Sequence, residues 1–356
     1  MALTEFGVND PQAVKLYSKL TFREALKNTL FSKFLGTSKN SIIMRLMELE
    51  KDAGDTIKYD LLMQTTGEGV SGNSWMKYNE APLVYYQDSV VIKQLRQAHM
   101  FDRESQQRTL HDLRQDAREN LADWWRNTLD TYMLRYLGGD TSINHGQAGV
   151  NPDSDHYIVA GDVTFTGTIT DDEDNIGAND QISLLDLDYA KEKAKTIDPM
   201  IRPTKIEGGE YYVAVLHPYS LTDLKVSTLS TTIKWHEIQQ YANVRGLKNP
   251  IFSGANGVYN GIIIYDDARV YSPQTNVRRN LFLGAQAGVF AVGNAYDRID
   301  RHRLDGLPMS WVEDMEDYRD KKGIAAGMIF GMKACRFNNK NFGCMVITCR
   351  SNATHN

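Results

Sequence analysis

Two glycine patterns in the sequence resemble nucleotide-binding loops but lack the residues that such loops need. The run 67–72 has the spacing G-x-G-x-x-G, and Asp88 follows about where a ribose-binding acid would lie. No helix is predicted in the residues that follow, 73–78 with Pro82 beyond, so no helix N-terminus would be available for a pyrophosphate, and a loop tip is favoured. The run 288–293 has the glycine spacing of a phosphate loop but continues with Asn-Ala at 294–295 instead of Lys and Ser or Thr. Close packing of small residues is therefore the favoured interpretation there.

The candidate metal-binding patterns are also incomplete. His-Glu at 236–237 begins an H-E-x-x-H pattern, but Gln240 stands where the second imidazole belongs. The acidic run 171–174 could attract Ca²⁺, yet Ile176 and Ile182 replace the glycine and the bidentate glutamate of an EF-hand loop. A solvated acidic loop is the favoured alternative. We expect no catalytic, cofactor-binding or metal-binding residues in this chain, and hence no enzyme.

Cysteine usage and overall composition limit the classes of protein to which the chain could belong. Cys335, Cys344 and Cys349 are odd in number and fit no metal framework, which favours reduced, packed thiols. The chain has 356 residues, 42% of them hydrophobic, and a net charge of -5, as expected for a globular protein of about two domains without a basic surface for nucleic acid. No run is apolar enough to span a membrane and the start lacks signal-peptide features, so we expect synthesis in the cytosol.

A long hairpin is predicted near the N-terminus. Residues 56–63 alternate between apolar and polar, residues 83–93 are β-branched and aromatic, and the glycine-rich run between them predicts a flexible tip. A two-stranded ribbon is marginal alone in water, so its large aromatic and methionine side chains need a cover. We predict that the hairpin either folds back on its own domain or lies on another copy of the chain. The candidate inter-subunit contact residues are Trp75, Met76, Tyr78, Tyr85 and Tyr86.

A very long helix follows the hairpin. Residues 103–137 contain no Gly or Pro, and apolar residues recur at helical spacing until Gly138 and Gly139 end the pattern. At 1.5 Å per residue this helix would be about 50 Å long, so it needs neighbours along its length. We predict that other parts of the chain or other subunits cover it.

An acidic segment comes next, and the rest alternates between helix and strand. No Lys or Arg occurs between Arg135 and Lys191, and residues 157–170 alternate like a hairpin, which predicts an acidic surface insertion. The remaining segments predict an α+β fold. Its expected helices are 184–195 and 220–224, and its expected strands are 211–216, 261–265, 323–336 and 342–349.

The order of these elements resembles the HK97-type fold of tailed-phage major capsid proteins, and more closely the N4-like phage major capsid family. The resemblance rests on short motifs that run in order over nearly the whole chain. They are the residues at 15–20, 88–90, 94–96, 122–125, 216–219, 249–252, 259–261, 281–287, 317–318, 322–323 and 336–338. None of these motifs is catalytic.

The resemblance implies a domain division and a function. The expected parts are an N-terminal arm (1–53), an E-loop hairpin (54–98), a P-domain (99–210) with spine helix 103–137 and acidic insertion about 140–180, a mainly A-domain region (211–322), and C-terminal strands that return to the P-domain (323–356). The implied function is a major capsid protein that self-assembles as pentamers and hexamers into an icosahedral head around double-stranded DNA. The negative net charge argues against specific DNA contact.

The implied partners are other copies of this chain and a portal protein, and a decoration protein is left open. Because the first 50 residues look too short for a built-in scaffold, we expect a separate scaffolding protein or none. The implied location is the virion, after assembly in the host bacterial cytoplasm, without a membrane. Lys58 and Lys77 match no cross-linking motif. Two alternatives stay open. An encapsulin-like nanocompartment would hold enzyme cargo in place of nucleic acid, and a soluble oligomeric enzyme without a recognisable motif would form a small closed oligomer.

Overall fold

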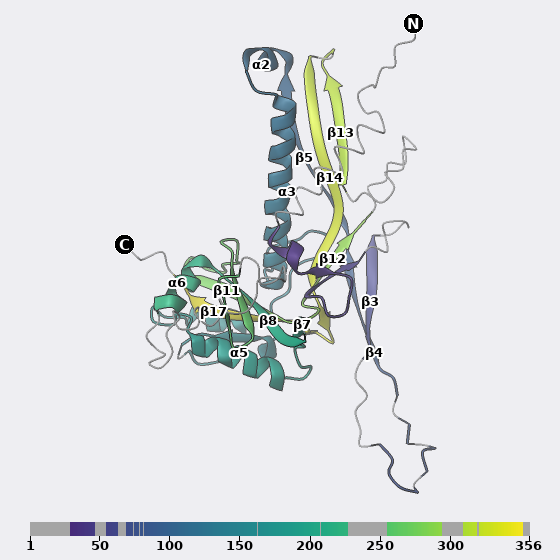
Figure 1. The fold of residues 1–356 in the computed structure, drawn as a ribbon, viewed down its shortest axis with the longest axis vertical. Helices are drawn as coiled ribbons and strands as arrows, with labels where there is room; N and C mark the ends of the chain where they lie inside the picture. Colours follow the sequence, from purple (N-terminus) through teal and green to yellow (C-terminus); the bar gives the residue numbers. More distant parts are fainter. Residues whose placement is uncertain are drawn as a thin grey trace.

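The structure is a computed structural model, and it describes residues 29–46, 55–62, 69–73, 75–77, 79–80, 82–161, 163–206, 208–226, 255–293, 309–318 and 320–351. The molecule is elongated, with a long helix beside long strands at one end and a lobe of strands and shorter helices at the other (Figure 1). The hairpin formed by β3 (Thr56–Leu62) and β4 (Tyr85–Val91) projects away from both parts. The predicted hairpin is thus present, and Thr56 pairs with Val91 at its base.

The first sheet is built around β14 (Lys321–Ala334), which is long enough to pair with three strands. Small and apolar residues alternate along it, and one of its faces is covered. The other strands of this sheet are β1 (Leu35–Gly36), β2 (Ile43–Leu46), β5 (Lys93–Asp102), β12 (Gly288–Val292) and β13 (Met309–Glu316). The run 288–293 is therefore mostly a buried strand, as expected from its small residues, and not a phosphate loop.

The helix α3 (Leu113–Leu137) covers one face of this sheet. Leu121, Trp125 and Met133 lie on one stripe of the helix and are buried in the same apolar cluster as Phe290 and Phe330. The stripe arises because residues four apart in sequence share a helix face. The sheet is therefore the neighbour that the long helix was predicted to need.

The predicted single helix over 103–137 is wrong in one respect, because the structure divides it. A short helix α2 (Arg103–Arg108) ends at Thr109, which is extended, and α3 begins after Asp112. The Asp112 carboxylate accepts hydrogen bonds from the N–H groups of Arg114 and Gln115, at 3.0 and 3.4 Å. Such capping competes with a continuous helix, and it needs neither Gly nor Pro.

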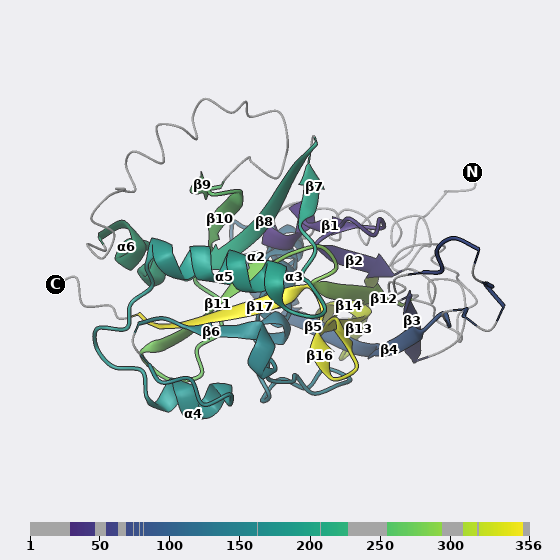
Figure 2. The same cartoon turned by 90° about the horizontal axis from the view of Figure 1, so that it is seen from below.

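The second sheet lies in the other lobe and is covered on both faces. Its strands are β6 (Tyr157–Val159), β7 (Thr204–Ile206), β8 (Gly209–Leu216), β9 (Gly257–Tyr259), β10 (Ile262–Asp266), β11 (Val277–Leu283) and β17 (Cys344–Arg350). The helix α5 (Leu184–Thr196) lies across one face (Figure 2), and the opposite face contributes to the cluster around α3. Strands buried on both faces read as continuous apolar runs, which is how β8 and β17 were predicted.

The two expected C-terminal strands go to different sheets. β14 lies beside α3 as expected, but β17 pairs with β11 and β6 in the second sheet. In the same way, β12 and β13 belong to the first sheet although they lie within 211–322. The expected α5 and α6 (Pro218–Val226) are both present. Neighbouring segments in sequence are thus shared between the two sheets, and a division by sequence alone cannot separate them.

The acidic segment is not only a surface insertion. In place of a hairpin it forms the 3₁₀ turn η3 (Ser154–His156), β6 and the helix α4 (Ile169–Asp174). Asp172 and Glu173 are buried because each has a specific partner: Asp172 accepts a hydrogen bond from the Tyr157 hydroxyl at 2.6 Å, and Glu173 pairs with Arg279. Buried charges are retained where they are paired.

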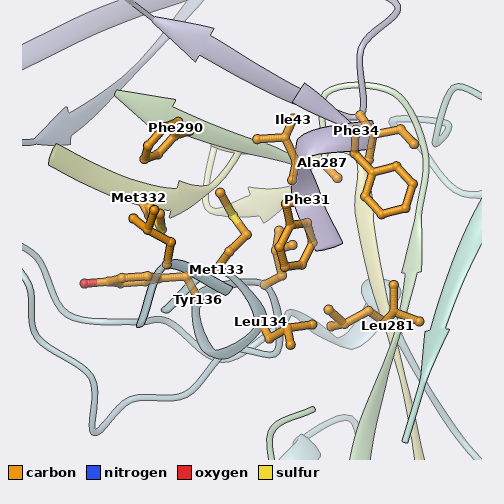
Figure 3. Packing of buried hydrophobic residues seen from close by; sticks show 14 of the residues in the cluster. Phe31, Phe34, Ile43, Met133, Leu134, Tyr136, Leu281, Ala287, Phe290 and Met332 are labelled. Carbon is orange, nitrogen blue, oxygen red and sulfur yellow. The ribbon is translucent and has the colours of Figure 1, made fainter. Parts of the chain in front are cut away.

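The segment around the 3₁₀ turn η1 (Leu30–Lys33) packs against α3, although about 80 residues separate the two in the sequence. This turn lies on α3, and the ring of Phe31 lies beside Met133 and Leu134 (Figure 3). The ring of Phe34 packs edge-on against Tyr265, with the centroids 5.2 Å apart. The N–H of Leu30 donates to the carboxylate of Asp130 on α3, at 3.1 Å. This contact fixes where the chain enters the body.

Candidate assembly surfaces

The base of the hairpin is fastened to its own subunit. Ile57 and Val90 are buried in an apolar cluster with Val289, Phe337 and Phe342, all from outside the hairpin. The predicted alternative of folding back on its own domain therefore holds for the base.

Asp88 is the polar centre of this attachment. Its carboxylate accepts hydrogen bonds from the Tyr59 hydroxyl at 2.6 Å and from the N–H of Arg336 at 3.2 Å, and it forms an ion pair with Lys333. The same environment raises the pKa of Tyr59 well above its usual value, chiefly because the ring is buried. The sequence suggested no such role for Asp88, because its partners on β14 and at residue 336 could not be seen from spacing.

The hairpin tip, residues 69–85, differs sharply from the base. Trp75 is 79% exposed and Met76 is 66% exposed, and Tyr85 is also exposed. Tyr86 is half-buried and packs on the apolar cluster at the base, so it has a cover within the subunit. Tyr78 lies outside the described residues. Of the five predicted contact residues, three thus present open apolar surface at or near the tip.

Two further exposed apolar residues of the tip escaped sequence analysis. Leu83 is 64% exposed, and Val84 is exposed beside it. The pairing of β3 with β4 ends at Leu62 and Tyr85, so these two residues precede the paired strand. Residues 83–93 were predicted as one strand, because nothing in their sequence marks the point where pairing stops.

A second exposed apolar surface lies at the far end of the first sheet. Leu110, between α2 and α3, and Tyr318, in the turn after β13, are both fully exposed. The N–H of Arg103 donates to the Asp320 carbonyl at 2.9 Å, which ties the start of α2 to the turn after β13. Asp317 and Tyr318 both have positive φ, 51° and 54°, although neither is glycine. Such backbone strain commonly marks a functional position.

The face of the first sheet turned away from α3 is flat. Cross-strand pairing places Met100, Gly323 and Asp314 in one row, with Ala98 and Ala325 in the next row beside an exposed valine of β13. The opposite face meets α3, where His99 contacts Asn120 at 3.2 Å. Small side chains therefore leave a shallow surface on which another chain could lie closely.

The cysteines and the potential metal ligands can be assessed among the described residues. The three cysteines are free and buried, and burial raises the pKa of Cys335 and of Cys349 to about 12, so both are held as thiols. Within the part of the chain that the structure describes, no cluster of His, Cys, Asp and Glu could hold a metal ion. No helix among these residues is long and apolar enough to cross a membrane. The H-E-x-x-Q run at 236–240 lies outside the described residues.

Comparison with known proteins identifies the family to which the chain is similar. The model of a family described as phage capsid protein matches residues 5–352. A curated major capsid protein of Pseudomonas phage KPP25 is 26% identical over 381 aligned positions, which cover 96% of each chain.

Solved structures give the same result at the level of the fold. The capsid of Ralstonia phage GP4 is 27% identical, with a TM-score of 0.78 and 93% of each chain covered. The capsid of cyanophage Pam1 is 19% identical, with a TM-score of 0.73, and covers 99% of this chain and 95% of that chain, which is a likeness of fold. The HK97-like fold expected from the order of elements is confirmed.

Proposed function

This chain belongs to the phage capsid protein family and is a major capsid protein, and we propose that its copies assemble as pentamers and hexamers into the icosahedral head of a tailed phage. The observation that carries the assembly proposal is the hairpin tip. Trp75 and Met76 are largely exposed, whereas the base of the same hairpin is buried in its own subunit. A rigidly based arm with an open apolar tip is suited to cover, and be covered by, a second copy.

We propose that the five tip residues Trp75, Met76, Leu83, Val84 and Tyr85, with Tyr78, contribute to this contact. The flat face that includes Ala98, Met100 and Ala325, and the far end with Leu110 and Tyr318, are further surfaces open to neighbouring copies. Large shells gain strength from many contacts of modest affinity.

The chain's charge supports a proposal about its cargo. The net charge is -5, so a shell of many copies would not attract a tightly packed polyanion by its overall charge. We propose that the head encloses double-stranded DNA without specific binding. We also propose that assembly takes place in the host cytoplasm, with a separate scaffolding protein, a portal and a decoration protein as partners. We propose no enzymatic activity for the chain. We keep the proposed division into arm, hairpin, P-domain and A-domain.

Replacing Trp75 by Ala tests the assembly proposal. We expect the Trp75→Ala variant to keep the melting temperature of the isolated subunit, because the side chain has little cover there, but to form far fewer particles in negative-stain microscopy. Trp311→Ala is the matched control, since Trp311 is buried and its loss should lower the melting temperature. If Trp75→Ala assembled normally, or if it melted as early as the control, the tip would not be an assembly contact.

A further inference from the structure

Along the chain, the single residue Ile92 connects the hairpin strand β4 to β5 of the first sheet. Val91 is the last residue of β4 and pairs with Thr56, whereas Lys93 is the first residue of β5 and pairs with Phe330. Between them, Ile92 donates its N–H to the Asp55 carbonyl at 2.8 Å. The direction in which the hairpin leaves the body therefore depends on this joint, in addition to the contacts of its base with the apolar cluster and with Lys333 and Arg336.

A closed loop from the acidic segment, residues 143–149, is fastened to α3 beside this joint. The N–H of Gly149 donates to the Ile143 carbonyl at 3.1 Å and closes the loop. The Tyr136 hydroxyl of α3 accepts from the N–H of His145 at 2.9 Å and donates to the Gln147 carbonyl at 2.8 Å. Tyr136 is buried, so the loop is held from its centre by a rigid helix.

The side chain of Gln147 spans the joint. Its Oε1 accepts from the N–H of Val91, the last hairpin residue, at 3.4 Å. Its Nε2 donates to the Met332 carbonyl of β14 at 2.9 Å. One amide group thus connects the hairpin to the central strand of the first sheet.

His145 holds the other side of the same joint. Its Nε2 lies 3.1 Å from the Lys93 carbonyl, and its ring stacks on Phe330 with the centroids 4.4 Å apart. Burial lowers the pKa of His145, and the facing groups are Lys93 of β5 with Tyr132 and Tyr136 of α3. The ring is therefore neutral near pH 7, with one N–H to donate.

Gly146 completes the fit. Its φ is 83°, and a Cβ at this position would lie 3.1 Å from the Val91 carbonyl oxygen. The loop can therefore approach the end of the hairpin this closely only with glycine between its two anchoring side chains.

We propose that loop 143–149 is a brace that fixes the direction of the hairpin relative to the first sheet. It contacts the chain on both sides of Ile92 and is itself anchored on α3, which is the arrangement that resists bending at a single joint. Its importance for a shell rests on the proposed function, because the hairpin direction would decide where the tip meets a neighbour. The brace itself is a property of the single subunit.

Distance measurement between two spin labels tests the brace without requiring assembly. Labels at Leu83→Cys on the tip and Leu110→Cys at the far end would react selectively, because both positions are exposed and the three native cysteines are buried. Dilution with unlabelled subunits keeps the measured distance within one chain. We expect one narrow distance distribution in the otherwise unchanged full chain.

Gln147→Met removes both hydrogen bonds but keeps the side-chain volume, and we expect it to broaden that distribution. His145→Phe keeps the ring stacking, removes the N–H, and should broaden it as well. Gln115→Ala is the control, since Gln115 is exposed on α3 and its side chain donates to Glu119 of the same helix, far from the brace. Unchanged widths in both brace variants would overturn the proposal, whatever their melting temperatures. Failure of the full chain to form particles would contradict the proposed function but leave this result intact.

Discussion

At the scale of single residues, Arg279 forms a buried ion pair with Glu173 and connects this part of the second lobe to the long helix. Both side chains are 2% exposed, and two nitrogens of Arg279 meet the two carboxylate oxygens at 2.6 and 2.8 Å. Arg279 also donates to the carbonyls of Gly138 and Gly139 at the end of α3, at 3.0 and 2.9 Å. A strand of the second sheet, the acidic segment and the long helix thus share one guanidinium group.

Arg279→Ala should destabilise the subunit strongly. The change leaves the Glu173 carboxylate buried without its partner, which typically costs about 3–5 kcal/mol. Urea unfolding of the isolated subunit measures the loss, and a double variant that also carries Glu173→Gln should recover part of it because no buried charge is left. A loss below about 1 kcal/mol, the value of an exposed pair, would show that the pair is not buried as described.

His217 gives a prediction about pH. Its Nδ1 accepts the N–H of Tyr219 at 3.2 Å at the start of α6, and burial together with the nearby Arg278 lowers its pKa to about 4. His217 therefore binds its proton near pH 6.5 in the unfolded chain but only near pH 4 in the folded chain. Stability from this group is present above about pH 6.5 and falls as the pH drops to about 4, by at most about 1.4 kcal/mol per pH unit.

Comparison with His217→Asn isolates this contribution, because Asn also accepts a hydrogen bond at a helix start but does not titrate. Urea unfolding at a series of pH values should show a flatter decline for the variant between pH 6.5 and 4. Parallel curves for the two proteins would contradict the assignment.

At the scale of elements, the break between α2 and α3 depends on a capping side chain. Asp112→Ala removes the acceptor for two N–H groups at the start of α3 and should cost about 1 kcal/mol in the free energy of unfolding. Asp112→Asn keeps an acceptor and should cost much less. Equal losses in the two variants, measured by urea unfolding, would mean that the side chain does not act as a cap.

The same scale shows which elements could be predicted from sequence. The strands β3, β8 and β17 and the helix α5 follow directly from alternation, buried apolar runs and helical spacing. The break at Asp112 was missed because no Gly or Pro marks it. The helix α4 was missed because the buried partner of Glu173 is Arg279, far away in the chain, and an acidic run by itself indicates a solvated surface.

At the scale of the whole molecule, sequence patterns identified the order of elements but not their distribution between two sheets. β14 and β17 look alike as apolar runs, yet one lies beside α3 and the other in the second sheet. The exposed tip was predicted because Trp75 and Met76 sit in a two-stranded arm that cannot cover them. The exposure of Leu110 and Tyr318 was not predicted, because a single apolar residue in a turn forms no sequence pattern.

Trp75 and Met76 are expected to be buried only when a second copy covers them, and oxidative footprinting of these two residues measures that burial. Hydroxyl radicals modify exposed indole and thioether groups, and mass spectrometry reads their modification in dissociated subunits and in assembled particles. We predict rapid modification in subunits and strong protection in particles, with buried Trp311 protected in both. Equal modification of Trp75 and Met76 in subunits and particles would show that no second copy covers the hairpin tip.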